Sequence, residues 1–234
     1  MSGAQDEQKA KAGRAAAALV EPGMTVGLGT GSTAALFVRA LAERRLDIRA
    51  VATSNATAAL ATSLGIEVVD LDEARDIDLT IDGADEIGPE LALIKGGGAA
   101  LLREKLVWEA SRRCVAIADE SKLGAPFGRF PLPVEVVAFG HLTTAARMTR
   151  VLADLDLDVD ASPIEPRLRL KDGAPLVTDG GNLIYDLALG RIGEPELLEA
   201  ALKSLTGVVE HGLFLGLAER ALVARADRVE TLWP

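Results

Sequence analysis

The chain has 234 residues, of which 49% are hydrophobic and 26% are charged, a composition typical of a globular protein with a sizeable core. Its formal net charge of −10 and its 3% of aromatic residues argue against a nucleic-acid partner, because phosphates would be repelled and few rings are present to stack on bases. No apolar run reaches the roughly 18 residues of a membrane span, and no secretory signal is visible. We therefore expect a cytoplasmic protein without a membrane partner.

Two residue types restrict the chemistry further. The single cysteine, Cys114, excludes an intrachain disulfide, and its apolar neighbours Val115 to Ala118 predict a buried strand position. His141 and His211 are isolated and show no metal-ligand spacing, so we expect surface or capping positions for both and no metal site.

The first half of the chain alternates between helical and strand patterns. Helical spacing or alanine-rich composition predicts helices over 5–20, 34–41, 56–64 and 99–110. Short apolar segments predict strands over 25–28, 48–52, 67–69, 78–81 and 114–118. Strands that alternate with helices favour parallel pairing, so we predict an α/β fold with a Rossmann-like, open, mostly parallel sheet covered by helices on both faces.

The pattern changes after the proline-rich segment Pro126 to Pro133. Beyond it, strands are expected over 134–137, 167–170 and 176–178, helices over 143–155 and 194–205, and a hairpin turn over 179–182 that leads into 183–186. We predict a smaller α+β domain over residues 130–205, inserted into a main domain formed by 1–129 and 206–234. The tail from Gly212 is expected to return to the first sheet.

Polar turns follow several of the predicted strands, and in open α/β sheets ligands bind beyond these carboxyl ends. In Gly27 to Thr33, glycines let backbone N–H groups approach an anion, and Thr30, Ser32 and Thr33 add hydroxyl donors. A dinucleotide site also requires an acidic residue after the second strand, but this chain has Ala52-Thr53-Ser54 there. We therefore favour a lone phosphate over a dinucleotide as the ligand of this turn. A tight turn before a capped helix remains the alternative.

Carboxylates and a glycine run make up the next two turns. Asp82 to Glu86 follows a buried strand and can accept hydrogen bonds from sugar hydroxyls or bind Mg²⁺, although a plain surface turn would look similar. Lys95 precedes Gly96 to Gly98, where three glycines between ordered elements indicate close approach of backbone to a ligand rather than a linker. Glu104 then lies early in a helix, either directed at the glycine turn or on a solvated face.

Together these motifs resemble the type A ribose-5-phosphate isomerase family. The resemblance rests on Gly27 to Thr33, Asp82 to Glu86, Lys95 to Ala100, Arg103 to Lys105, Ala118 to Lys122, Phe130 to Val136 and Val177 to Asn182, which occur in the family's order. It implies interconversion of ribose 5-phosphate and ribulose 5-phosphate in the non-oxidative pentose phosphate pathway, with no metal, no organic cofactor and a homodimeric or homotetrameric assembly.

The resemblance also implies residue roles. Glu104 takes the place of the general base, and Asp82, Asp85 and Lys95 take the places of the other catalytic residues. Substrate contacts are implied at Thr30, Gly31, Ser32, Thr33, Asp82, Gly83, Ala84, Asp85, Lys95, Gly96, Gly97, Gly98, Lys122 and Lys9.

These residue types suit the reaction. One carboxylate above both carbons can move a proton between them through a cis-enediolate, while a lysine and backbone N–H groups stabilise the charged oxygen. Two rival interpretations are a non-catalytic sugar-phosphate sensor, which in repressors accompanies a helix-turn-helix that this chain lacks, and a sugar-phosphate deaminase or lactonase. Ketose formation from ribose 5-phosphate, against ammonia release from an amino-sugar phosphate, distinguishes the enzymes.

Overall fold

The computed structural model describes residues 2–74, 76–155, 158–160 and 164–234, and the chain forms two compact units. The first unit comprises Met1–Ala84, Arg103–Leu123 and Gly216–Pro234, and the second comprises Asp85–Leu102 and Gly124–Leu215. The polypeptide therefore passes between the units four times. No helix in the described ranges combines the length and the apolar character that a membrane crossing needs.

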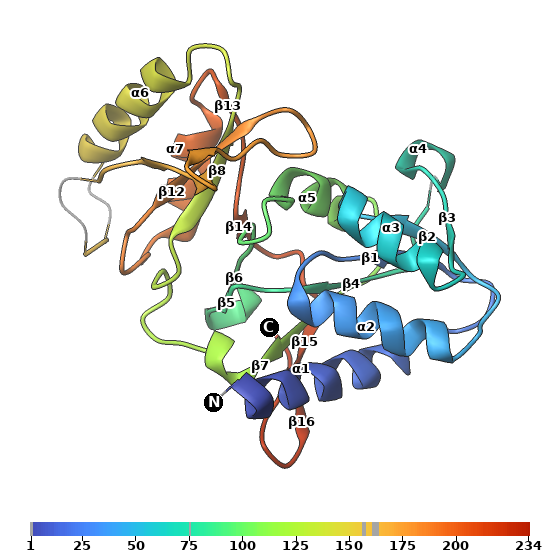
Figure 1. The fold of residues 1–234 in the computed structure, drawn as a ribbon. Helices are drawn as coiled ribbons and strands as arrows, with labels where there is room; N and C mark the ends of the chain where they lie inside the picture. The colour runs from blue at the N-terminus through green and yellow to red at the C-terminus, as the bar shows by residue number, and fades with distance from the viewer. Residues whose placement is uncertain (1, 75, 156–157, 161–163) are drawn as a thin grey trace. The chain divides into compact units, whose positions relative to one another are not determined.

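A seven-stranded sheet forms the centre of the first unit, in the order β16-β15-β7-β4-β1-β2-β3 (Figure 1). Its strands are β1 (Thr25–Leu28), β2 (Arg49–Ala52), β3 (Glu67–Val68), β4 (Leu79–Gly83), β7 (Cys114–Asp119), β15 (Arg220–Ala224) and β16 (Val229–Leu232). All neighbours pair in parallel except β15 and β16. The predicted mostly parallel sheet and the return of the tail to it are confirmed, and β1, between β2 and β4, marks the point where the strand order reverses.

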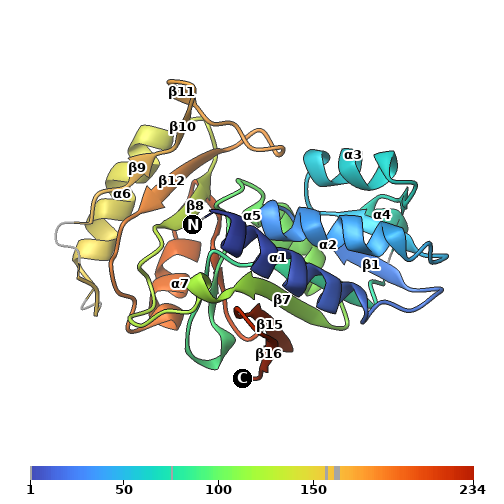
Figure 2. The same ribbon diagram turned by 60° about the horizontal axis from the view of Figure 1, so that its bottom comes forward.

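Helices cover both faces of this sheet. One face packs against α1 (Ser2–Ala17), α2 (Ser32–Glu43) and α3 (Asn55–Ser63), and Figures 1 and 2 show α1 and α2 side by side. The opposite face packs against α4 (Leu71–Ala74) and, through Val107, α5 (Leu101–Glu109). Val26 and Leu28 face the first layer, while a Cβ on the intervening Gly27 would lie 1.8 Å from Thr80 Oγ1 in the neighbouring strand and 2.9 Å from Val107 Cγ1 in α5. Gly27 therefore allows α5 to lie close to the sheet.

A second, antiparallel sheet organises the other unit, in the order β13-β8-β12-β9. It consists of β13 (Val208–His211), β8 (Leu132–Val136), β12 (Leu183–Leu187) and β9 (Arg167–Leu168). Alternate residues of β8 and β12 share one hydrophobic core with α6 (His141–Ala153) and α7 (Pro195–Lys203), so both helices cover the same face.

Short strands complete this unit. One small sheet has the order β14-β6-β5, formed by β14 (Leu213–Phe214), β6 (Leu93–Ile94) and β5 (Glu86–Ile87), with the 3₁₀ turn η1 (Pro89–Leu91) between β5 and β6. A hairpin joins β10 (Leu170–Lys171) and β11 (Ala174–Pro175). The strand predicted over 176–178 is wrong in extent, since only Val177 forms a bridge there, to Leu183.

The compact units divide the chain differently from the expected limits at residues 130 and 205. Asp85–Leu102 joins the second unit, because β6 pairs with β14 and the backbone N–H of Lys95 donates to Gly212 O at 2.9 Å. These pairings link segments that are distant in sequence, so the pattern of hydrophobic and polar residues within either segment does not predict them.

The expectations for the cysteine and the histidines had different outcomes. Cys114 is buried in β7 as predicted. His211 is also buried, with Glu210 and Glu199 beside its ring, so the surface position expected for it is wrong. His141 is the first residue of α6, and its Nδ1 lies 2.8 Å from the Tyr185 hydroxyl.

Candidate active site

The turn between β1 and α2 exposes backbone donors at the start of a helix. Gly31 has a φ of 108°, in the region that favours glycine, and α2 begins at Ser32 without a side-chain hydrogen bond to its first turn. The first N–H groups of a helix have no partner within the helix and carry partial positive charge. Because Ser32 is exposed, this helix start can bind an anion such as phosphate.

The Thr30 hydroxyl has a different surrounding from the Ser32 hydroxyl. Its Oγ1 lies 2.7 Å from Thr53 Oγ1, 2.8 Å from Ser54 Oγ and 3.2 Å from Thr57 Oγ1. Ser54 also caps α3 by accepting from the Thr57 N–H. Thr53 and Ser54, which follow β2 where a dinucleotide site would have an acid, thus fix the turn between β1 and α2. The Thr30 side chain contributes to the shape of the site.

Asp82, at the end of β4, is fully buried, and both oxygens of its carboxylate accept hydrogen bonds. Its Oδ1 accepts from the Thr30 N–H at 3.0 Å and from the Gly83 N–H at 2.7 Å, and its Oδ2 accepts from Trp108 Nε1 at 3.3 Å. Three donors converge on one carboxylate, an arrangement that stabilises its ionised form. Asp82 therefore joins the β1–α2 turn to helix α5.

Glycine at position 29 is a condition of this arrangement. A Cβ on Gly29 would lie 2.0 Å from Asp82 Oδ1 and 2.5 Å from Asp82 Cα. Gly83 has far more room, since a Cβ there would meet only the Thr30 carbonyl oxygen at 3.8 Å. Gly29, which the sequence motif shares with dinucleotide sites, is therefore needed here so that the Asp82 carboxylate can approach the turn.

Glu104 lies in the first turn of α5, and its side chain is only 3% exposed, so the alternative of a solvated face is wrong. The positive end of the helix dipole stabilises a carboxylate in this turn. Trp108 follows one helical turn later and is one of the three residues that donate to Asp82. One helix of the first unit thus carries the candidate base and a donor to Asp82.

In the second unit, a short hairpin brings Asp85 and Lys95 together. Asp85 precedes β5 and Lys95 follows β6, and in an antiparallel pair these two positions lie at the same end. The Asp85 N–H donates to Ile94 O at 2.8 Å. The Lys95 side chain is 2% exposed, and its Nζ lies 5.4 Å from the centre of the Phe214 ring. A buried ammonium on an aromatic face is held in place by cation–π attraction.

The glycine run continues directly from this hairpin. The Gly97 N–H donates to Asp85 Oδ2 at 2.7 Å, and a Cβ on Gly97 would lie 2.6 Å from Asp85 Oδ1. Asp85 and Asp82, which the sequence alone does not separate, therefore have different partners. Asp82 binds donors of the first unit, whereas Asp85 binds the glycine turn of the second.

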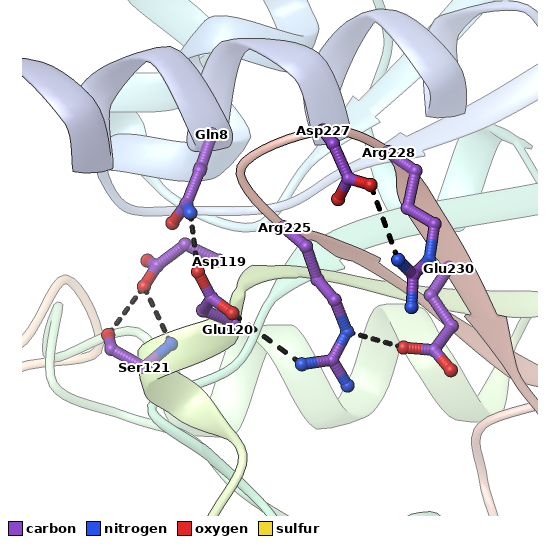
Figure 3. Close-up of polar contacts among 8 residues, drawn as sticks. All are labelled: Gln8, Asp119, Glu120, Ser121, Arg225, Asp227, Arg228 and Glu230. Carbon is purple, nitrogen blue, oxygen red and sulfur yellow. Dashed lines mark hydrogen bonds and ion pairs between the residues drawn. The ribbon is translucent and has the colours of Figure 1, made fainter.

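Lys9 and Lys122 belong to two elements of the first unit that are bonded to each other. Figure 3 shows Gln8 of α1 donating to Glu120 of the 3₁₀ turn η2 (Glu120–Lys122), at 2.7 Å. Asp119 caps this turn by accepting from the Ser121 N–H, and Gln5 Nε2 donates to Asp119 at 3.3 Å. Both lysines are half-buried, and these bonds connect the two elements that carry them.

The structure therefore groups the predicted residues in two sets. The first unit holds Thr30 to Thr33, Asp82 to Ala84, Glu104, Lys122 and Lys9, and the second holds Asp85, Lys95 and Gly96 to Gly98. Sequence reasoning missed Trp108 and Phe214, and only the four-residue spacing from Glu104 to Trp108 offered a signal. Within the described ranges, no three His, Cys, Asp or Glu side chains are arranged to hold a metal ion.

The comparisons that span most of the chain identify one family. The model described as Ribose 5-phosphate isomerase A (phosphoriboisomerase A) matches residues 49–228, and the model of the DeoR C terminal sensor domain matches residues 4–71. The ribose-5-phosphate isomerase A of Caulobacter sp. (strain K31) is 61% identical over 229 residues, covering 98% of this chain and 99% of that protein. The enzyme of Sinorhizobium fredii is 49% identical and covers 97% of both.

Solved structures show the same likeness. The crystal structure of ribose 5 phosphate isomerase A from Neisseria gonorrhoeae has a TM-score of 0.88 and 35% identity, covering 98% of this chain and 97% of that chain. A D-ribose-5-phosphate isomerase in complex with phospho-erythronic acid has a TM-score of 0.90 and 32% identity, covering 98% of this chain and 99% of that chain.

Proposed function

Because the chain belongs to the ribose 5-phosphate isomerase A family and interconverts ribose 5-phosphate and ribulose 5-phosphate, we propose that Glu104 is its general base. The reaction, a step of the pentose phosphate pathway, removes a proton from C2 of the aldose and returns a proton to C1. A single carboxylate above both carbons performs both transfers through a cis-enediolate. The observation that carries this proposal is the buried Glu104 carboxyl in the first turn of α5.

Lys95 and the glycine turn stabilise the enediolate oxygen in this proposal. The Lys95 ammonium is buried, so its charge acts in a medium that screens it less than water does. Backbone N–H groups of Gly96 to Gly98 add donors that need no reorganisation when charge develops. A preformed cation and fixed N–H groups are the arrangement that lowers the barrier to an oxyanion.

Asp82 and Asp85 have different roles in this proposal. Asp82 accepts from three donors of its own unit, so we assign it to holding Thr30 and the adjoining Gly83 and Ala84 in position against the sugar. Asp85 holds the glycine turn through Oδ2. Proton transfer between the two substrate oxygens is therefore assigned to Asp85.

The phosphate binds at the start of α2. Its partners in this proposal are the N–H groups that follow Gly31, the hydroxyls of Ser32 and Thr33, and the ammonium groups of Lys122 and Lys9. None of these groups reacts. Their binding energy fixes the sugar so that its C1 and C2 face Glu104.

Glu104→Gln tests the central assignment, because glutamine keeps the size of the side chain but does not accept a proton. We expect turnover to fall about 10³-fold, within the range that general-base groups contribute, while the Kd of the sugar phosphate by calorimetry stays nearly unchanged. Glu109→Gln, at the exposed end of the same helix, is the matched control and keeps full activity. Near-normal turnover of Glu104→Gln, or deuterium uptake from D₂O at the wild-type rate, contradicts the proposal.

The sensor interpretation accounts for less of the chain. Its family model matches residues 4–71, which include the phosphate turn but neither Lys95 nor Glu104. A sensor needs affinity for a sugar phosphate and has no use for a buried base. The Glu104→Gln variant of this chain is itself expected to bind the sugar phosphate without converting it.

A homodimer or homotetramer in the cytoplasm completes the proposal. Beside the family likeness, three apolar side chains within six residues favour self-association: Val137, Phe139 and Leu142 are 42%, 93% and 71% exposed. Phe139→Ser is expected to lower the mass measured by light scattering at dilute concentration. An unchanged mass for this variant removes Phe139 from the subunit contact.

A further inference from the structure

One peptide plane of the glycine turn is bonded at both of its ends. The Gly96 carbonyl oxygen accepts from Arg169 Nη1 at 2.7 Å, and the Gly97 N–H of the same plane donates to Asp85 Oδ2 at 2.7 Å. The C=O and N–H of a trans peptide point in opposite directions, so the two bonds fix one orientation of the plane. All of these residues lie in the second unit.

Arg169 is itself held in place by Asp186. Its Nε donates to Asp186 Oδ2 at 2.9 Å and its Nη2 donates to Asp186 Oδ1, a paired contact that only a guanidinium forms. The two side chains are 14% and 25% exposed. The backbone is fixed as well, since the Arg169 N–H donates to Ile184 O at 2.8 Å in the strand that carries Asp186. Nη1 is thus left directed at the turn.

The turn has little freedom to adopt another shape. Gly96 has a φ of 108°, and a Cβ there would lie 2.8 Å from Leu101 Cδ2 and 3.2 Å from Pro133 Cγ. Glycine is therefore required, yet glycine alone permits many conformations. Within the turn, the Ala99 N–H also donates to the Gly96 carbonyl oxygen, at 3.0 Å, and the Arg169 bond adds a charged donor to that oxygen from outside the turn.

We propose that Arg169, fixed by Asp186, is a positioning residue for the isomerase reaction. Its charge is applied to the Gly96 carbonyl, which polarises the peptide and strengthens the Gly97 N–H as a donor to Asp85. Arg169 thereby sets the direction of the Asp85 carboxylate and of the N–H groups that follow. This inference rests on the roles proposed above for Asp85 and the glycine turn.

The test compares Arg169→Gln, Arg169→Lys and Asp186→Asn with wild type. We expect Arg169→Gln to lower kcat about 10- to 100-fold, as a displaced catalytic group does, with KM changed far less. Arg169→Lys keeps a donor for the turn and loses the paired contact with Asp186, so an intermediate kcat is expected. Arg191→Gln is the matched control, because Arg191 pairs with Asp158 at 2.6 Å in the same unit.

Two further measurements separate positioning from a merely structural role. Added guanidinium ion is expected to restore part of the kcat of Arg169→Ala, while the control variant does not respond. In a double-mutant cycle, Arg169→Gln is expected to have little further effect on kcat in the Asp85→Asn background, because both changes interrupt one chain of bonds.

Several results would overturn the inference. They are a kcat of Arg169→Gln equal to that of Arg191→Gln, effects of Arg169 and Asp85 that add fully, or a loss of activity explained by a lower melting temperature alone. Failure of the proposed function gives a different result, because an active Glu104→Gln variant refutes the assignment of Glu104 as general base, whatever the activity of the Arg169 variants. A normal Arg169→Gln beside an inactive Glu104→Gln refutes only the positioning role.

Discussion

The Trp108 indole donates a hydrogen bond to the Asp82 carboxylate at 3.3 Å, and both side chains are buried. This contact joins the end of β4 to the helix that carries Glu104. A buried polar contact within the first unit therefore connects Asp82 with the Glu104 helix, and we expect its removal to affect the orientation of both.

Trp108→Phe keeps the aromatic volume and removes the donor. We expect a loss of unfolding free energy of about 1–3 kcal/mol, because a buried carboxylate oxygen loses a partner, and a fall in kcat/KM of about tenfold. Denaturant unfolding and steady-state kinetics measure the two effects. Trp233→Phe is the control, since Trp233 is 59% exposed, and it is expected to change neither quantity. Equal behaviour of the two variants counts against the contact.

Gly29→Ala tests the approach of Asp82 to the β1–α2 turn. The new Cβ would overlap Asp82 Oδ1 at 2.0 Å, so the carboxylate has to move and its bond from the Thr30 N–H is expected to break. We expect a large drop in activity and a lower melting temperature. Gly83→Ala places its Cβ 3.8 Å from the nearest atom, and its melting temperature is expected to stay close to that of wild type.

Substitutions at Ser32 distinguish backbone from hydroxyl contacts to the phosphate. Ser32 is the first residue of α2, where proline is compatible with the helix but has no N–H. If backbone donors bind the phosphate, Ser32→Pro raises KM about 10- to 100-fold, as loss of a hydrogen bond to a charged group does, and Ser32→Ala raises KM less. Both variants are expected to keep most of their kcat. A KM that rises equally in the two variants assigns the binding to the hydroxyl.

The lone thiol is expected to be inert in the folded protein. Burial raises the pKa of the Cys114 thiol to about 12, so almost no thiolate exists at pH 8. An aromatic disulfide reagent at pH 8 is expected to label no thiol in native protein and one per chain in guanidinium chloride. Rapid labelling of native protein contradicts the buried position in β7.

The Arg113–Glu219 pair predicts a specific dependence of stability on pH. The Arg113 hydrogen bond, at 2.7 Å, holds the pKa of the Glu219 carboxyl below its ordinary value of 4.5. A lowered carboxyl pKa stabilises the folded state above pH 4.5, and this contribution is lost as pH falls through the lowered value. Both side chains are partly exposed, so Glu219→Gln is expected to cost less than about 1 kcal/mol at pH 7.

Melting temperatures measured over a series of pH values test the Arg113–Glu219 pair. The difference between wild type and Glu219→Gln is expected to shrink toward zero in acid, and a difference that grows in acid contradicts the assignment. Glu67→Gln, at an exposed position of β3, serves as the control with no comparable trend.

The sequence predicted the central sheet well because its signals are local. Strands such as β1 and β7 are short apolar runs bounded by polar turns, and glycine marks the turn after β1. The mostly parallel order followed from helices alternating with strands, and the return of the tail to the sheet was expected from its short strand patterns. The positions of Asp82, Lys95 and Glu104 were recognisable from motifs, and their catalytic roles stay predictions.

What the sequence did not reveal depends on pairings between distant segments. Strands β5 and β6 have two residues each, too few for an alternating pattern, yet their pairing brings Asp85 and Lys95 to one end. Arg169 lies between Leu168 and Leu170 and belongs to no motif, and its partners become visible only once β12 has paired. His211 was expected at the surface, but it is buried in the fold, with Glu199 as well as the preceding Glu210 beside its ring.

The bond from Arg169 to Gly96 spans 73 residues and has a consequence for biosynthesis. A nascent chain contains the three proposed catalytic carboxylates, Asp82, Asp85 and Glu104, and the glycine run long before the ribosome adds the arginine that orients the run. Strand β15, which pairs with β7 in the central sheet, is made later still. Enzymatic competence is therefore expected only after β15 (Arg220–Ala224) has been made, so shorter nascent chains bury apolar surface but do not turn over sugar phosphate.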